Sequence, residues 1–413
     1  MPAEKLSLTD KSVEVILAYA STGLGHLRVT NALFEAAPKG VYPHLLRTSD
    51  PTASNLHRLT SLHPLTRAFL EWSQNGLPES FFTRSYRFLL RRGYQKVERE
   101  LTTLIEQEFN IVKTVVVIAT HFVLAHELAA TKEKLEKKLG VKILLFVCVT
   151  DDSPQKLWYV EGADCLFVPS VETKTSLHKY GDKNNLKPLK IEVLPYPLNP
   201  HLAVPLTKKE WREREEQNNP ASGKRIQVIV PVSGAAVNLA YTEDLMTSLV
   251  KRNPRFHFYV VSRVSMYTSM FINKIGRRPY ISLITSSHDR EIVKYYNDLV
   301  SSTVFSFEIT KPSEQGFKAL FTPHQKGGIT LLFAPPIGRQ EHDNLNFLRR
   351  HGLMEKRAFQ LSGNPKVAAE FIARKLEDRT FLNTLAEKPQ KETDETATNG
   401  AEQFWANVSA LLK

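Results

Sequence analysis

Short apolar segments that alternate with longer amphipathic ones constrain the fold of this chain more than any other feature. Three of these segments, at 13–20, 113–121 and 141–152, are apolar almost throughout, and two of them end in polar residues. Strands of this kind occur in parallel sheets that are covered by helices on both faces. The alternation therefore predicts an α/β protein built on parallel sheets. In such sheets, ligands bind outside the carboxyl ends of the strands.

The alternation stops once and then resumes, which divides the chain into two halves. Residues 206–224 are charged and then polar, and a second alternating set follows them. Because 413 residues suit two domains of ordinary size, we expect two Rossmann-like domains that face a central cleft. The predicted segments are an amino-terminal domain at 1–205 with an arginine-rich helical insertion at about 55–109, a linker at 206–224, a carboxy-terminal domain at 225–386, a polar linker at 387–400 and a helix at 401–413.

The composition indicates the class of protein. Hydrophobic residues make up 42% of the chain, and Cys148 and Cys165 lie in apolar segments, which is typical of buried thiols in a reducing compartment. The first residues include acids and lack the apolar core of a signal peptide. No apolar run reaches the ~18 residues that a membrane span needs. We therefore expect a cytoplasmic protein.

The net charge of +12 suits anionic partners such as nucleotides or phospholipid headgroups. In the predicted insertion, Arg84, Arg87, Arg91 and Arg92 are interleaved with aromatic and leucine residues. One interpretation is a peripheral face that docks on the anionic inner surface of a membrane. The other is a helix pair that packs on the domain with its arginines in water. No basic stretch shows aromatic stacking periodicity, so we expect no nucleic-acid partner.

Residues 13–37 predict a strand, a tight turn and a helix. Gly23 and Gly25 lack side chains, so the backbone can turn sharply and approach a ligand. The helix, expected from about Arg28, points free N–H groups at that ligand. His26 lies at the helix entrance, where it is either a catalytic group or a capping or core residue. Further polar residues end strands at the same predicted sheet edge, namely His121, Asp151 and Ser170.

Two loops of the second domain suggest a phosphate site. Ser233 and Gly234 lie in a turn of small residues after a strand, which leaves room for a phosphate or simply lets a helix pack closely. Lys311 follows another strand, and Ser313 is expected to cap the next helix. The lysine and the helix amides could together hold a diphosphate, although a lysine at a strand end is often only solvated.

A third loop of the second domain carries amide and carboxylate groups. Gln340, Glu341 and Asn344 fall in the loop and first turn of a predicted helix. Groups of this kind can form hydrogen bonds with several hydroxyls of a sugar. We therefore expect this loop to contribute to a carbohydrate site.

Several common motifs are absent from the sequence. The Gly-x-Gly-x-x-Gly fingerprint for dinucleotides fails because Arg28 occupies the third glycine position. No P-loop and no Gly-x-Ser-x-Gly hydrolase motif occur. No pair of histidines has the spacing of metal ligands. We therefore expect no metal site.

Three motifs resemble those of glycosyltransferase B-fold enzymes, most closely the family 28-like monogalactosyldiacylglycerol synthases and the N-acetylglucosaminyltransferase that forms lipid II. STGLGH, at 21–26, is similar to their glycine-rich loop that ends in histidine. The segment 149–173 resembles their T-D, W, G-A-D and V-P-S pattern. Residues 309–313 with 335–344 resemble their donor site, K-P-G-G followed by P-P and G-Q-E-x-x-N. The similarity runs through nearly the whole chain in matching order.

This resemblance implies a glycosyltransferase whose co-substrate is a nucleoside-diphosphate sugar, UDP-linked, and which needs no other cofactor. The acceptor would be a lipid or a small molecule with a hydroxyl group. The implied roles are His26 as the general base beside the acceptor hydroxyl, Lys311, Ser313 and the turn at 233–236 at the diphosphate, and Gln340, Glu341 and Asn344 at the sugar.

The chain departs from these relatives at two places in the donor site. Ser313 and Glu314 replace the glycine pair, and Ala319 replaces a carboxylate that holds the ribose. Glu314 either points away from the phosphates or takes over the ribose contact. Two alternatives follow, a catalytically silent sugar-nucleotide-binding protein and a sugar-nucleotide epimerase on the same fold. An epimerase needs paired acid and base carboxylates, which Asp151, Asp152 and Glu314 could supply.

Overall fold

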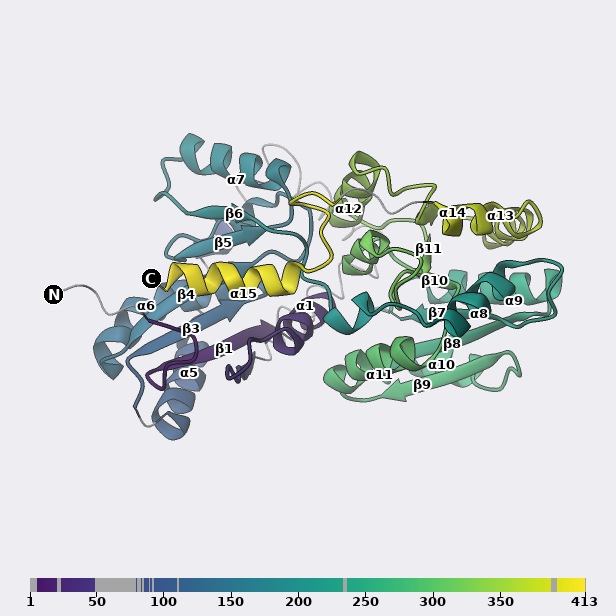
Figure 1. The fold of residues 1–413 in the computed structure, drawn as a ribbon. Coiled ribbons are helices and arrows are strands. Elements are labelled where there is room, and N and C mark those ends of the chain that lie inside the picture. Colours follow the sequence, from purple (N-terminus) through teal and green to yellow (C-terminus); the bar gives the residue numbers. More distant parts are fainter. Residues whose placement is uncertain are drawn as a thin grey trace. The chain divides into compact units, whose positions relative to one another are not determined.

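The computed structural model describes residues 6–20, 24–48, 79, 83, 85–88, 90, 93–109, 111–232, 236–387 and 392–412. The chain divides into two compact units, which are drawn in Figure 1. The first unit comprises Met1–Asn199 and Thr393–Lys413, and the second comprises Pro200–Glu392.

The first unit is built on a parallel sheet with the strand order β2-β1-β3-β4-β5-β6. Its middle strands β3 and β4 are buried almost throughout, which accounts for their lack of polar alternation. The described strands are β1 (Val13–Ala20), β2 (His44–Thr48), β3 (Thr114–Ala119), β4 (Lys142–Cys148), β5 (Cys165–Val168) and β6 (Ile191–Val193). The described helices include α1 (Leu24–Glu35), α5 (Gln95–Glu108), α6 (Phe122–Leu139), the 3-10 helix η1 (Lys156–Trp158), α7 (Val171–Lys183) and α15 (Gly400–Leu411).

The carboxy-terminal helix α15 belongs to the first unit, although the second unit precedes it in the chain (Figure 1). Trp405 donates a hydrogen bond from Nε1 to the carbonyl oxygen of Leu33 on α1, at 2.8 Å, and the ring of Phe404 lies 4.7 Å from that of Phe167 on β5. The helix begins at Gly400, where a Cβ would lie only 2.3 Å from the carbonyl oxygen of Pro195. Only glycine allows this close approach of two backbone segments.

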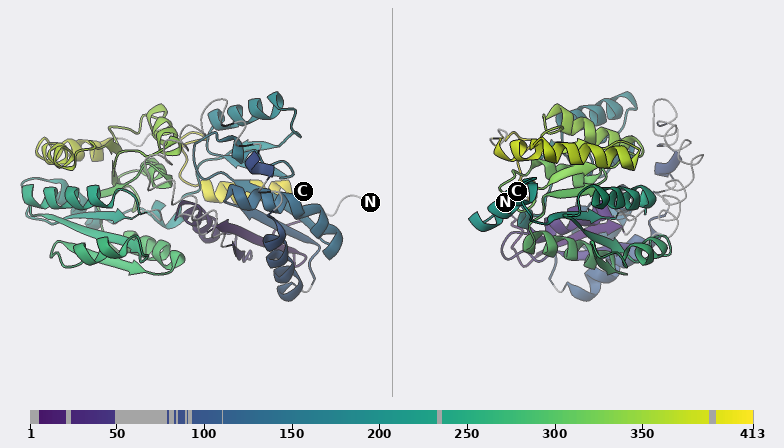
Figure 2. Two further views of the ribbon diagram at one scale, coloured as in Figure 1. Left: turned by 180° about the vertical axis from the view of Figure 1, so that it is seen from behind. Right: turned by 90° about the vertical axis from the view of Figure 1, so that its right-hand side faces the viewer.

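The second unit has its own sheet, which Figure 2 shows from behind. The sheet is parallel, with the strand order β12-β11-β10-β7-β8-β9. The two parallel sheets confirm the predicted α/β class with two Rossmann-like domains. The described strands are β7 (Ile226–Pro231), β8 (Phe256–Arg263), β9 (Ile281–Ser286), β10 (Phe307–Thr310), β11 (Thr330–Phe333) and β12 (Ala358–Gln360). The described helices are η2 (Pro200–Ala203), α8 (Lys208–Asn218), α9 (Leu239–Arg252), α10 (Ser269–Ile275), α11 (Asp289–Ser302), η3 (Glu314–Leu320), α12 (Arg339–Arg350), α13 (Pro365–Glu377) and α14 (Thr380–Ala386).

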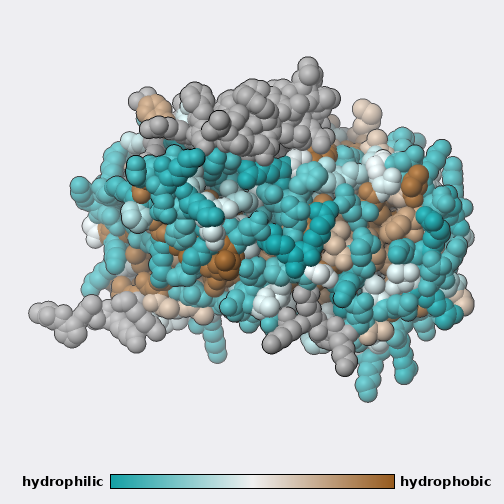
Figure 3. All heavy atoms as spheres, turned by 90° about the horizontal axis from the view of Figure 1, so that it is seen from above, coloured by the Kyte–Doolittle hydropathy of each residue, from teal (hydrophilic) through white to brown (hydrophobic). Residues whose placement is uncertain are grey.

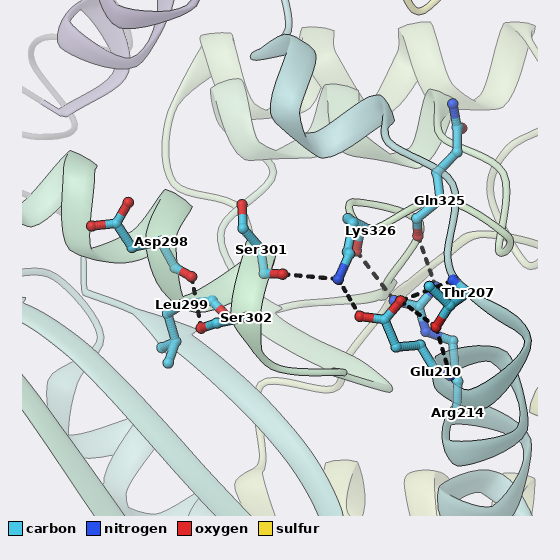
Figure 4. Close-up of polar contacts among 9 residues, drawn as sticks. All are labelled: Thr207, Glu210, Arg214, Asp298, Leu299, Ser301, Ser302, Gln325 and Lys326. Atoms are coloured by element: carbon cyan, nitrogen blue, oxygen red, sulfur yellow. Dashed lines mark hydrogen bonds and ion pairs between the residues drawn. The ribbon is translucent and has the colours of Figure 1, made fainter.

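The segment 206–224, expected to be a linker, contains helix α8 and belongs to the second unit (Figure 4). Thr207 and Glu210 form a capping box at its start, and Glu210 forms an ion pair with Lys326. Arg214 is buried, and burial lowers the pKa of its guanidinium to about 9. The guanidinium donates hydrogen bonds at 2.5–3.2 Å to the carbonyl oxygens of Phe305, Pro323, Gln325, Lys326 and Gly328. The charge pattern of this segment predicts a linker because the sequence does not reveal these partners.

The described part of the arginine-rich insertion argues against one of the predicted membrane contacts. Arg87 is buried and forms an ion pair with Glu161 at 2.6 Å, so its charge is not available to a membrane. Arg84, Arg91 and Arg92 lie outside the described residues.

The surface seen from above is mainly hydrophilic, with scattered hydrophobic side chains (Figure 3). Such scattered exposure is usual for a folded protein.

No helix in the described part of the chain is long and apolar enough to cross a membrane.

Candidate functional site

In the first sheet, β1 lies between β2 and β3, so the strand order changes direction there. Ligands of open α/β sheets bind at the carboxyl ends of the strands beside such a point. Helix α1 follows β1, and it begins at Leu24 instead of the predicted Arg28. Gly25 and His26 therefore lie in its first turn, while Gly23 lies outside the described residues.

The structure brings His26 to the end of β3. Its Nδ1 lies 2.8 Å from the carbonyl oxygen of Thr120 and 3.0 Å from Oγ1 of Thr150. A carbonyl oxygen can only accept a hydrogen bond, so Nδ1 carries the proton. In the neutral ring, Nε2 then holds the lone pair and can accept a proton.

A chain of hydroxyl groups supports this position of His26. Thr30, one turn further along α1, donates from Oγ1 to the carbonyl oxygen of His26 at 2.8 Å. The same hydroxyl lies 2.8 Å from Oγ1 of Thr120. Thr30 and Thr120 are both buried. The helix and the strand end are thus joined by hydrogen bonds, which restricts the orientation of the imidazole.

Aromatic rings line the imidazole of His26. His121 packs edge-on against it with ring centroids 4.5 Å apart, and Phe122 stacks on His121 at 4.8 Å. Trp158 lies 6.5 Å from His26 and 5.7 Å from Phe122. The sequence predicted His121 at this edge. It did not single out Phe122 or Trp158, although Trp158 is the tryptophan of the motif at 149–173.

The predicted strand-end residue Ser170 and the neighbouring carboxylate of Asp152 have a structural role. The carboxylate of Asp152 accepts hydrogen bonds from the hydroxyls of Ser170 and Thr173, the latter at 2.8 Å. Oγ of Ser170 also accepts a hydrogen bond from the backbone N–H of Thr173 at 3.1 Å, which caps helix α7. Asp152 and Ser170 therefore hold the start of α7. Asp151 is half-buried beside them.

In the second sheet the strand order changes direction between β10 and β7. Ser233 and Gly234, predicted after β7, lie outside the described residues. The turn that follows them has Ala236 and Asn238 in the left-handed region, with φ of 54° and 62°. This backbone conformation is uncommon for residues other than glycine, and it leads directly into α9.

After β10 the structure brings together three predicted residues. Lys311 forms an ion pair with the buried carboxylate of Glu341, whose second oxygen accepts a hydrogen bond from the backbone N–H of Ile337 at 2.7 Å. Asn344 donates from Nδ2 to the carbonyl oxygen of Pro312 at 3.2 Å. These contacts join the loop after β10 to helix α12. Burial raises the pKa of Glu341, and the charge of Lys311 opposes this effect.

The prediction that the side chain of Ser313 caps the next helix was wrong. The side chain of Ser313 makes no capping hydrogen bond, and residues 314–320 form the short 3-10 helix η3. A 3-10 turn of this length lacks the aligned amides of an α-helix. Glu314 is half-buried at its start, and its charge also raises the pKa of Glu341, so the two carboxyls are near each other. Gln340 is half-buried in the first turn of α12.

The structure also describes Ala319, the residue at the position where the related glycosyltransferases carry a carboxylate that holds the ribose. Ala319 is buried, and its neighbour Lys318 forms a buried ion pair with Glu308 on β10. The hydroxyl of Tyr296 donates to the same carboxylate at 2.7 Å. This part of η3 is therefore anchored in the core of the second unit. Among the described residues, no group of three or more His, Cys, Asp or Glu side chains could hold a metal ion.

Comparisons with known proteins show the fold. A scan against protein-family models and a search of curated proteins found no match. Among solved structures, the chain is similar to MnaA from S. aureus in a structure with UDP, with a TM-score of 0.54, 10% identity and coverage of 97% of this chain and 96% of that one.

Two other solved structures are similar over almost their whole length. The UDP-GlcNAc 2-epimerase from Neisseria meningitidis bound to UDP-GlcNAc has a TM-score of 0.54 and 11% identity, and the match covers 96% of this chain and 99% of that one. UGT89C1 from Arabidopsis thaliana, complexed with UDP-L-rhamnose, has a TM-score of 0.50 and 13% identity, with coverage of 96% and 98%. The chain thus has the glycosyltransferase B fold, two Rossmann-like domains in one chain, which these UDP-sugar-binding proteins share.

Proposed function

We propose that this protein is a glycosyltransferase that moves a sugar from a UDP-linked donor to an acceptor hydroxyl, with inversion at the anomeric carbon. The observation that carries the proposal is the hydrogen bond from Nδ1 of His26 to the carbonyl oxygen of Thr120. It places the proton on Nδ1, so that Nε2 carries the lone pair of the neutral ring, at the carboxyl ends of β1 and β3. A placed base of this kind contributes about 10²–10⁴-fold to a rate.

In this reaction Nε2 of His26 removes the proton of the acceptor hydroxyl. The oxygen forms a bond to the anomeric carbon, and the bond between that carbon and the diphosphate breaks, with UDP leaving on the opposite face. Lys311 supplies positive charge for the leaving diphosphate in the second unit. Asn344 on α12 donates a hydrogen bond to the adjacent Pro312, and Gln340 lies in the first turn of the same helix. Fixed charges and donors of this kind stabilise charge that develops in the transition state.

The donor assignment has two supports. The three similar solved structures hold UDP, UDP-GlcNAc and UDP-L-rhamnose. In addition, the motifs at 21–26, 149–173 and 309–344 resemble those of family 28-like glycosyltransferases. We therefore assign UDP as the nucleotide, and we leave the sugar and the exact acceptor to experiment.

An epimerase on the same fold is the competing hypothesis, because one of the similar solved structures is the UDP-GlcNAc 2-epimerase from Neisseria meningitidis. Epimerisation by this route needs acid and base carboxylates in the site. Asp152 is buried, and the hydroxyls of Ser170 and Thr173 occupy its Oδ1 as part of the α7 cap. Asp152 therefore has a structural role, whereas the other two carboxylates named for an epimerase, Asp151 and Glu314, are half-buried and belong to different units. The experiment described next separates the two reactions.

The test compares the wild type with His26→Ala. We expect the variant to lose sugar transfer by about 10²-fold or more while its affinity for the UDP-sugar, measured by calorimetry, stays the same. His178→Ala on α7 is the matched control and should transfer sugar at the wild-type rate. A panel of uridine, guanosine and thymidine sugar nucleotides identifies the donor.

Three results would contradict the proposal. Acceptor-free isomerisation of the sugar nucleotide would show an epimerase. Tight binding of a UDP-sugar with no turnover across a broad acceptor panel would show a binding protein. Wild-type transfer by the His26→Ala variant would remove His26 from catalysis.

A further inference from the structure

Exposed apolar side chains gather in the turn between β8 and α10 of the second unit, two elements that Figure 1 labels. Met266 and Met270 are 80% and 83% exposed, and Val264 and Tyr267 are 41% and 37% exposed. These four are a third of the large hydrophobic residues that are exposed in the described part of the chain, and they fall within seven positions. Residues 264–270 are termed the apolar turn. Single exposed apolar residues are usual, but a cluster of them marks a site of interaction.

Hydrogen bonds hold the apolar turn in one conformation. Thr268 is buried, and its Oγ1 donates to the carbonyl oxygen of Arg263 at 2.6 Å and accepts from the backbone N–H of Ser265 at 2.9 Å. Oγ of Ser269 donates to the carbonyl oxygen of Ser265 at 2.6 Å. The two methionine side chains are therefore presented to solvent by a fixed backbone, and their exposure is not a consequence of a loose segment.

The neighbours of the apolar turn are basic. The backbone N–H of Val264 donates to the carbonyl oxygen of Ser286 at 2.8 Å, so the turn lies beside the end of β9 and the segment that leads to the exposed Arg290 on α11. On α10, Met270 and Lys274 are four residues apart, which places them on one face of the helix. Basic side chains therefore flank the apolar turn on two elements.

The charge of this region is positive overall. Residues 263–294 contain six lysines and arginines and only two acidic residues. Ion pairs with Asp289 and with Glu243 on α9 neutralise part of this charge. Arg277 and Arg290 are exposed and contribute to the excess. An apolar cluster within a positive surface matches a layer of anionic lipid, which offers negative headgroups above an apolar interior.

The size of the apolar turn argues against a protein partner. Its apolar side chains expose a few hundred Å² at most, whereas a stable protein interface needs about 800 Å² from each partner. Lipid sets no such threshold, because each inserted side chain gains free energy by leaving water. Methionine is flexible enough to fit among fluid lipid chains, and tyrosine is enriched at membrane–water interfaces.

We propose that the apolar turn docks on the surface of an anionic membrane. Met266 and Met270 insert among the lipid chains, and Arg277 and Arg290 lie at the phosphates of the headgroups. This surface is separate from the arginine-rich insertion, in which Arg87 is buried. The inference goes beyond the proposed function and does not depend on it, because binding to lipid requires no sugar transfer.

The test measures sedimentation of the full-length chain with vesicles of phosphatidylcholine mixed with phosphatidylglycerol, and with vesicles of phosphatidylcholine alone. We expect the wild type to bind the anionic vesicles at least tenfold more tightly, because each basic residue near an anionic surface contributes about fivefold. Met266→Ser/Met270→Ser should weaken binding to the anionic vesicles by at least tenfold, because two inserted side chains are lost. Arg277→Gln/Arg290→Gln should weaken it by about tenfold.

Ile111→Ser/Val367→Ser is the matched control, because it removes two apolar side chains that are exposed elsewhere in the chain. It should bind the vesicles as the wild type does. All of these variants change exposed side chains, so their urea midpoints of unfolding should equal that of the wild type. Met266→Trp reports insertion directly, since brominated phospholipid in the vesicles should quench its fluorescence more than that of the wild type.

Four results would overturn the inference. They are a wild type that does not bind the anionic vesicles, a methionine double variant that binds them as tightly as the wild type, a control that weakens binding equally, and a Met266→Trp variant that is quenched no more than the wild type. A dimer in sedimentation velocity that the methionine double variant loses would show self-association and would also overturn it. Vesicle binding that depends on the methionines, in a protein that transfers no sugar, would support the membrane surface and refute the glycosyltransferase.

Discussion

Replacing Glu341 by glutamine separates two roles for this residue. The resemblance to glycosyltransferases places Glu341 at the sugar, whereas the structure pairs its carboxylate with Lys311 and with the backbone N–H of Ile337. If UDP binds at Lys311, the carboxylate of Glu341 repels the diphosphate. The Glu341→Gln variant keeps the shape of the side chain and removes this repulsion. We therefore expect it to bind UDP more tightly than the wild type.

The size of the effect follows from the ion pair. Both the carboxylate and the diphosphate would contact Lys311, so their charges would be roughly 6 Å apart, where two unit charges repel by about 3 kcal/mol at an effective dielectric constant of 20. Solvent and salt reduce this by about half, which leaves a gain of roughly tenfold in affinity. Stability should fall, because the substitution leaves the mostly buried ammonium of Lys311 without its carboxylate partner, and breaking a buried ion pair in this way costs up to about 3–5 kcal/mol.

Calorimetry with UDP at pH 8 measures the effect, with Glu377→Gln on the exposed side of α13 as the control. The pH dependence gives an independent check with UDP-glucose. Because the pKa of Glu341 is raised, its carboxyl becomes neutral at a higher pH than an ordinary glutamate, and binding should tighten as the pH falls. Glu341→Gln should lack this dependence. Unchanged or weaker UDP binding by the variant would refute the electrostatic argument.

Two further predictions concern stability. Burial alone would raise the pKa of Glu210, but hydrogen bonds from Lys326 and Thr207 outweigh it and lower the pKa to about 2. The resulting stabilisation, about 1 kcal/mol after allowance for solvent, is present above pH ~4.5 and lost as the pH falls toward 2, so urea midpoints of the wild type and Glu210→Gln should differ above pH ~4.5 and converge only near pH 2. Gly400→Ala places a Cβ against the carbonyl oxygen of Pro195 and should cost about 2–3 kcal/mol in urea unfolding, and an unchanged midpoint would contradict the packing.

Much of the fold follows from the sequence because apolar strands have few alternatives. Segments such as 114–119 are apolar at every position, and only a parallel sheet covered on both faces accommodates them. The carboxyl ends of parallel strands lie at the same edge of a sheet, so the sequence could predict that His26 and His121 lie at one edge. The loops of Lys311 and Glu341 follow the neighbouring strands β10 and β11, but the sequence did not predict that the two side chains form an ion pair.

The features that the sequence did not reveal depend on tertiary partners. From the sequence alone, Arg214 would be assigned as a solvated charge, because only the structure shows the carbonyl groups that surround it. The sequence allows Arg87 to be interpreted as a membrane contact, because only the structure shows its ion pair with Glu161. Ser313 has the composition of a helix cap, but the segment after it winds as a 3-10 helix packed on Phe333. Composition and spacing carry no information on such contacts.

The central claim is that His26 presents an unprotonated Nε2 to the acceptor. Nitrogen-15 NMR of the histidine side chains at pH 8, with His26→Ala used to assign the signal, tests it most directly. The account predicts the tautomer with the proton on Nδ1, held by the carbonyl oxygen of Thr120. A proton on Nε2 instead would contradict the role of His26 as the base.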